Sequence, residues 1–296
     1  MRTTFNTAAA ILFLATLPSS VLAESSAPDI VRPDRHALMM PANPALPSLF
    51  LIGDSTVRNG QGRGDGGQWG WGDCLAPFFD TNKINVVNRA LGGTSSRTFY
   101  RDRWPAVLAI IKPGDFVIMQ FGHNDGSAVN DATRARGTIR GTGDETQSIT
   151  NLLTKQPEIV HSFGWYEKQI ITEARAKGAT PMVCSLIPRN SWKNGHAARN
   201  KNDYAGWAGQ VAKSENAPFL DINEIIARQY DQLGQEKVKP LFIVGAGPHT
   251  SRSGAETNAA CVVAALKGLK VNPVARFFSL KADAVSAVDL TQSASE

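Results

Sequence analysis

The chain has little cysteine, no long apolar run and no block of like charge, and each lack excludes a class of protein. Three cysteines in 296 residues are too few and too scattered for a disulfide framework or a zinc site. For Cys74, Cys184 and Cys261, one disulfide plus a free thiol and three reduced thiols both stay open. No segment approaches the roughly 20 apolar residues that span a bilayer, so we expect no membrane partner. The net charge of +5 lacks Lys/Arg clusters and gives little support for nucleic-acid binding.

Several short catalytic signatures are also missing. There is no His-Glu-x-x-His and no Cys-x-x-Cys, so no sequence motif supports metal catalysis. There is no Gly-x-Ser-x-Gly elbow, which argues against an α/β-hydrolase of the lipase type.

The amino terminus has the form of an export signal. Arg2 supplies a positive start, an apolar stretch follows over 8–17, and Val21-Leu22-Ala23 offers small residues for cleavage after Ala23. We therefore expect a secreted or periplasmic protein, and a monomer. The predicted organisation is a signal peptide over 1–23, a linker rich in Pro, Ala and Ser over 24–47, one domain over 48–272 and a loose C-terminal tail over 273–296.

Short apolar runs alternate with amphipathic segments through the domain. The runs are continuous, as in strands buried on both faces of a parallel sheet, and occupy 49–52, 84–88, 116–121, 181–187 and 217–222. Helical spacing occupies 99–111, 164–177, 203–215, 224–233 and 253–268. This order predicts an α/β fold with a doubly wound parallel sheet of about five strands and a site at the carboxyl ends of the strands.

Two of the segments that follow these elements carry candidate catalytic side chains. Ser55, in Gly53-Asp54-Ser55-Thr56, directly follows the first strand, where its hydroxyl would be exposed at the sheet edge as a nucleophile. The alternative is an ordinary turn, because Gly, Asp and Ser all favour turns. His249 lies in the loop before the last helix, a suitable place for a base, although an isolated His is more often a surface or core residue.

Two further loops offer hydrogen-bond donors. The glycines of Asn88–Arg97 let the backbone turn an N–H toward a ligand, and Asn124 follows the third strand with a side-chain amide. Each loop alone is weak evidence for a functional site, but the ends of successive strands lie together in space. Converging N–H groups there would form an oxyanion hole, in which one donor contributes about 3 kcal/mol.

These blocks, in this order, resemble the SGNH/GDSL hydrolase superfamily and, more narrowly, the rhamnogalacturonan acetylesterase family. The similarity covers roughly 49–269 and rests on Gly53-Asp54-Ser55, Val87 to Arg97, Gln120 to Asp125, Gly164-Trp165-Tyr166, Pro188-Arg189-Asn190, His249-Thr250-Ser251 and Gly254-Ala255. The resemblance implies a three-layer α/β/α fold without metal or cofactor. It implies Ser55 as nucleophile, His249 as base, and an oxyanion hole formed by the Ser55 and Gly93 backbone N–H groups and the Asn124 side chain; Asp54 would be structural.

One position departs from the family pattern. An aspartate stands three residues before the histidine in that family, whereas this chain has Ala246, whose methyl group cannot accept the ring N–H hydrogen bond. Three explanations stay open: a Ser–His dyad oriented by a backbone carbonyl or water, an acid from elsewhere such as Asp221, or an inactivated site. In a serine protease, disabling this carboxylate lowers turnover by about 10⁴.

The predicted function is removal of O-acetyl groups from plant cell-wall polysaccharide, rhamnogalacturonan (pectin) or xylan, through an acyl-enzyme on Ser55. A general GDSL-type esterase or lipase, and a weakened carbohydrate-binding homologue, are the alternatives. Among the tryptophans, we single out Trp192, in the loop after the fourth strand, as a candidate for stacking on sugar.

Overall fold

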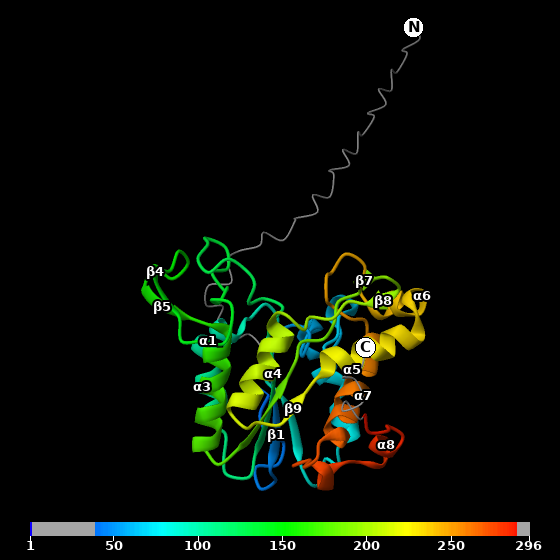
Figure 1. Ribbon diagram of the computed structural model, residues 1–296. Helices are drawn as coiled ribbons and strands as arrows, with labels where there is room; N and C mark the ends of the chain where they lie inside the picture. The colour runs from blue at the N-terminus through cyan, green and yellow to red at the C-terminus, as the bar shows by residue number, and fades with distance from the viewer. Residues whose placement is uncertain (2–38, 289–296) are drawn as a thin grey trace.

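A computed structural model describes residues 1 and 39–288 (Figure 1). Apart from Met1, the predicted signal peptide lies outside the described residues, as do 24–38 of the linker and 289–296 of the tail. One parallel sheet runs in the order β2-β1-β3-β6-β9. Its strands are β1 (Ser48–Gly53), β2 (Asn85–Asn88), β3 (Phe116–Gln120), β6 (Thr180–Cys184) and β9 (Phe219–Leu220). All five predicted strands are present and the predicted fold is confirmed.

The sheet lies between two helical layers, each with its own apolar core (Figure 1). Every residue of β1 and β3 is buried, because these central strands are covered on both faces. On one face Phe50, Ile52 and Val117 pack against α1 (Ser96–Asp102), α2 (Trp104–Leu108), α3 (Phe163–Ala176) and α4 (Tyr204–Ser214). On the other, Leu49 and Leu51 pack against α5 (Ile222–Leu233) and α7 (Arg252–Gly268).

The helix predicted over 99–111 is wrong in its extent. The structure has two short helices, because Arg103 leaves helical geometry at φ −126° and a new helix begins at Trp104, with Pro105 in its first turn, where the missing N–H is tolerated. The other four predicted helices are α3, α4, α5 and α7, with small shifts of their ends.

Several smaller elements have no counterpart in the prediction. Two hairpins lie at the top of Figure 1, on opposite sides: β4 (Thr146–Thr150) with β5 (Pro157–His161), and β7 (Trp192–Lys193) with β8 (His196–Ala197). The remaining pieces are α6 (Gln235–Val238), α8 (Leu280–Asp283) and the 3₁₀ turns Gly60–Gly62, Asp65–Gly67, Trp71–Cys74, Ala76–Phe78, Lys239–Leu241 and Ala275–Phe277.

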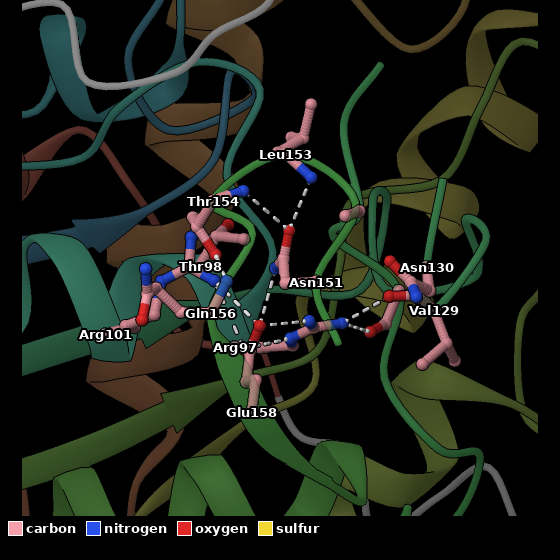
Figure 2. A network of polar contacts seen from close by, with 12 residues as sticks. Arg97, Thr98, Arg101, Val129, Asn130, Asn151, Leu153, Thr154, Gln156 and Glu158 are labelled. Atoms are coloured by element: carbon pink, nitrogen blue, oxygen red, sulfur yellow. Dashed lines mark hydrogen bonds and ion pairs between the residues drawn. The ribbon is translucent and has the colours of Figure 1, made fainter. Parts of the chain in front are cut away.

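A buried arginine holds the long segment between β3 and α3 against α1 (Figure 2). The side chain of Arg97 is fully buried and pairs with Glu158 of β5 at 2.7 Å. Its Nη1 donates to the carbonyls of Val129 and Gly137, at 2.7 and 2.8 Å. Burial opposes ionisation of Glu158, but Arg97, Asn151 and Arg101 outweigh it and hold its pKa at about 2. The loop of 121–138 is thereby fixed by charge-assisted bonds.

The sequence analysis expected a loose C-terminal tail from residue 273. In the structure, the part of this segment that is described, 273–288, packs against the domain. Phe277 and Ala282 are buried, and Val285 and Val288 pack on the core beside α7. The Lys267 ammonium donates to the carbonyls of Ala282 and Val285 and holds the segment in place. Isolated apolar residues in a polar stretch are enough to dock it. Residues 39–47 of the linker contain neither helix nor strand.

Cys74, Cys184 and Cys261 are all buried and unpaired, which settles the choice between a disulfide and free thiols. Among the helices of residues 39–288, none is both long and apolar enough to cross a membrane.

Candidate active site

Ser55 sits in a tight turn at the carboxyl end of β1. Gly53 is required there, because its φ is +155° and a Cβ would lie 2.5 Å from the carbonyl oxygen of Gln120. The Thr56 N–H and hydroxyl both donate to Asp54 Oδ1 at 2.8 Å. Asp54 is fully buried, which raises its pKa to about 6 despite these bonds. It therefore holds the turn that presents the Ser55 hydroxyl.

The loop after β2 lies against this turn. The Leu91 N–H donates to the Gly53 carbonyl. A Cβ placed on Gly92 would lie 3.5 Å from Ser55 Cβ, so this loop lies in contact with the nucleophile turn. Gly93 has φ +85°, a left-handed conformation that glycine adopts without strain. Within residues 39–288 the N–H groups of Ser55 and Gly93 donate to no protein acceptor. Both are available to a ligand oxygen.

Asn124 joins these donors from the carboxyl end of β3. Its Nδ2 donates to the Thr94 carbonyl at 2.8 Å, which uses one amide hydrogen and leaves the second for a ligand. The next residue, Asp125, accepts from the N–H groups of Ser96 and Gly122, both at 3.0 Å, and so ties the start of α1 to the end of β3. The structure thus brings Ser55, Gly93 and Asn124 together, as predicted.

His249 reaches the site from the loop before α7. Its Nε2 lies 2.9 Å from Ser55 Oγ, hydrogen-bond distance for a nucleophile and its base. Thr250 fixes the loop: its carbonyl accepts from the Trp69 N–H and its hydroxyl donates to the Trp69 carbonyl. The Ser251 side chain then caps the first turn of α7.

No third member of a triad is in place in the described part of the chain. Ala246 closes a turn with His249, whose N–H donates to its carbonyl at 3.3 Å. Within residues 39–288 His249 Nδ1 has neither a carboxylate nor a backbone carbonyl as acceptor. Asp221, the remote candidate acid, caps α5 and accepts from Ser185 Oγ at 2.9 Å. It does not line the site.

These residues open on a cavity of about 450 Å³. Three arginines, Arg134, Arg136 and Arg189, line it, and its described lining includes no aspartate or glutamate. Its other lining residues are Ser55, Asn59, Gly92, Gly93, His123, Asn124, Ala246, Gly247, Pro248 and His249. The wall is therefore polar and positively charged around the Ser55–His249 pair.

Comparison with known proteins places this site in a family. Residues 51–254 match the GDSL-like Lipase/Acylhydrolase family. The chain is also 32% identical over 227 residues to the probable rhamnogalacturonan acetylesterase YesY of Bacillus subtilis, across 75% of this chain and 93% of that protein. The chain belongs to the GDSL-like lipase/acylhydrolase family.

Further similarities agree with this membership. A rhamnogalacturonan acetylesterase of Emericella nidulans is 29% identical over 231 residues, across 77% of this chain and 88% of that protein. The crystal structure of YxiM from Bacillus subtilis superposes with a TM-score of 0.60 at 24% identity, over 75% of this chain and 56% of that one, and supports the fold. Family membership confirms the predicted SGNH/GDSL resemblance and makes the chain a carboxylic ester hydrolase.

Trp192 is not brought to this cavity. It lies in β7, partly buried against the core, and its Nε1 donates to Asn190 Oδ1 at 2.7 Å. Sequence reasoning missed the lining arginines. Arg189 comes shortly after β6, so its place near a strand end was a usable signal. Arg134 and Arg136 lie on the segment after β3, for which the sequence offered no such signal.

Asn124→Ala is expected to lower kcat for short acetyl esters by about 10²–10³, the usual effect of losing one oxyanion donor, with a smaller change in KM. The Thr94 carbonyl also loses its partner, so the fold should be checked by thermal unfolding. Steady-state kinetics with p-nitrophenyl acetate measures the effect. An unchanged kcat would mean that other groups hold the oxyanion.

The acid limb of kcat/KM is expected to have its midpoint below pH 6.5. His249 must be neutral to accept the Ser55 proton, and burial together with the nearby Arg189 guanidinium lowers its pKa from the ordinary 6.5. Activity should therefore persist as the pH falls through 6.5 and disappear only below it. Arg189→Gln should move the midpoint upward. A midpoint above 6.5 in the native chain would contradict this assignment.

Proposed function

We propose that the chain is an exported serine esterase that removes O-acetyl groups from an acidic plant polysaccharide, acetylated rhamnogalacturonan being the leading case. The observation that carries the proposal is the Ser55–His249 pair, 2.9 Å apart, opening on a cavity with three lining arginines. YesY is named a probable rhamnogalacturonan acetylesterase and the Emericella nidulans relative a rhamnogalacturonan acetylesterase, which supports the same substrate. The predicted signal over 1–23 supports export.

The mechanism we propose is acyl transfer. Ser55 Oγ attacks the acetyl carbonyl carbon while its proton passes to His249 Nε2. The carbonyl oxygen, now negative, accepts hydrogen bonds from the Ser55 and Gly93 N–H groups and the Asn124 amide. The proton on Nε2 then goes to the departing sugar oxygen. Water, deprotonated by the same nitrogen, attacks the acyl carbon; the bond to Ser55 Oγ then breaks, that oxygen takes the proton back from Nε2, and acetate is released.

The charge of the cavity favours a pectic substrate over xylan. Galacturonate residues carry carboxylates, and arginine binds carboxylates through charge-assisted hydrogen bonds. The described lining has only Ala246 and Pro248 as apolar side chains, which suits a sugar ester better than a long acyl chain. A general lipase is therefore the weaker alternative. A sugar-binding homologue, which Ala246 invites, is separated from both enzymes by a p-nitrophenyl acetate assay.

Arg134→Gln tests the preference for acidic substrate. We expect KM for acetylated rhamnogalacturonan to rise about 10-fold, the loss of one charge-assisted hydrogen bond, while KM for acetylated xylan changes less than about 2-fold. Acetate release from both polymers measures it. Lys193→Gln, which removes an exposed cation on β7 outside the cavity, should change neither KM. A native chain that prefers xylan would refute the pectic assignment.

A further inference from the structure

The catalytic histidine lies beside cationic and hydrogen-bonding groups that have no anionic partner. Within residues 39–288 the guanidinium of Arg189 makes neither a hydrogen bond nor an ion pair, although it lines the cavity with Ala246 and His249. An atom added at Gly247 would lie 3.4 Å from Arg189 Nη1, so the guanidinium reaches the backbone of the loop that carries His249. The place where the family has a carboxylate is therefore next to an unpaired cation.

His123 lines the same cavity. Both of its ring nitrogens are buried, and the backbone of Ile187 is a hydrogen-bonding neighbour of the ring. Burial, with Arg189 and His249 nearby, lowers the pKa of His123 to about 3, so the ring is neutral at neutral pH. A neutral ring has one N–H to donate. The neutral ring therefore adds no charge beside Arg189 and His249.

Together these groups match one kind of ligand. Arg189 can bind a carboxylate bidentately, and His249 Nδ1–H needs an acceptor. No aspartate or glutamate of the described lining competes for them.

We propose that a carboxylate ligand binds between Arg189 and His249, beside Ala246, and acts as the third member of the triad. The proposal rests on the proposed function in one respect, the role of His249 as base. The bound carboxylate accepts the Nδ1–H hydrogen bond, which fixes the tautomer with Nε2 free for the Ser55 proton. It forms and breaks no covalent bond. When Nε2 takes the proton from Ser55, the carboxylate stabilises the imidazolium, and when that proton passes to the leaving sugar oxygen, the site returns to its starting state.

The carboxylate has two chemical sources. One is a small free carboxylate such as formate, or the acetate that the reaction releases. The other is the carboxylate of a uronate residue in the substrate itself. The two sources share one binding chemistry and differ in whether an added carboxylate changes the rate.

The first experiment measures kcat of the full chain on p-nitrophenyl acetate, a neutral substrate, with increasing sodium formate, against sodium chloride at equal ionic strength. We expect formate to raise kcat saturably, by about 10-fold or more, since the missing carboxylate is worth up to about 10⁴. Chloride should not. Arg189→Gln should reduce the rise below about 2-fold, and Lys193→Gln, the matched control, should keep it. Ala246→Asp should start from a higher kcat and no longer respond to formate.

The second arm identifies the source. With acetylated xylo-oligosaccharides, formate should raise kcat as it does with p-nitrophenyl acetate. With acetylated galacturonate oligosaccharides, an absence of any formate effect together with a high initial kcat shows that the substrate's own carboxylate fills the site. A rise with both substrates shows that a free carboxylate fills it.

Measurable native activity without any formate-dependent rise would overturn the proposal, as would a full rise in Arg189→Gln. If the native chain has no more activity than Ser55→Ala, the proposed function fails. Binding of the carboxylate is then tested by a method that needs no turnover. The imidazole signals of His249 are followed by NMR during a formate titration. A saturable shift that raises the His249 pKa, and that Arg189→Gln abolishes, supports the site; no shift overturns it.

Discussion

Ser55→Ala is expected to lower kcat for acetyl esters about 10⁴- to 10⁶-fold, the range seen when members of a serine-hydrolase triad are removed. The hydroxyl is the atom that would form the acyl-enzyme, and it lies 2.9 Å from His249 Nε2. The fold should survive, because the bonds that hold the turn are made by Asp54 and Thr56.

Turnover of p-nitrophenyl acetate measures the loss, and circular dichroism with thermal unfolding checks the fold. Ser191→Ala is the matched control, because Ser191 is exposed and lies outside the cavity. It should retain full activity. If Ser55→Ala keeps its turnover after contaminating esterase has been ruled out, Ser55 is not the nucleophile.

Ala246→Asp is expected to raise kcat by about 10³–10⁴, the reverse of disabling the triad carboxylate. The new carboxylate would lie in the turn that ends at His249, and can accept the Nδ1–H that has no acceptor in the described structure. The gain should appear in kcat rather than KM, because the carboxylate matters most when the imidazole is charged. Ala246 has a negative φ, so the larger side chain brings no backbone strain.

The isosteric Ala246→Asn variant separates charge from size. It should gain far less than the aspartate variant, because an amide cannot stabilise the imidazolium in the same way. An Ala246→Asp variant with equal or lower kcat would mean that another acceptor already serves His249.

The sheet and the nucleophile side of the site could be predicted because their signals are local. Five continuous apolar runs gave the five parallel strands, and each strand end placed its following loop at one edge of the sheet. Ser55, Gly93 and Asn124 follow three neighbouring strands, so their convergence required only the strand order.

The positions of Arg134 and Arg136 in the cavity wall could not be predicted, because they depend on contacts between distant residues. Arg97 holds the loop that carries Arg134 and Arg136 through the carbonyls of Val129 and Gly137, and its ion-pair partner Glu158 is 61 residues away in the chain. The partner strand β4 is largely exposed and polar, so it lacks the apolar alternation that would indicate a strand. The orientation of Trp192 likewise depends on a hairpin whose strands have only two residues each, too short for hydrophobic periodicity to reveal.

The distance along the chain between the proposed nucleophile and the proposed base affects when the chain can become active. Ser55 and His249 are 194 residues apart, and the loop of His249 is held by its bonds to Trp69. Closing a loop of this length is entropically unfavourable until the intervening elements have packed. The central strands can therefore associate while the chain is still unable to hydrolyse an ester. Recovery of activity after denaturation reports the docking of the last segment, and not the earlier formation of the sheet.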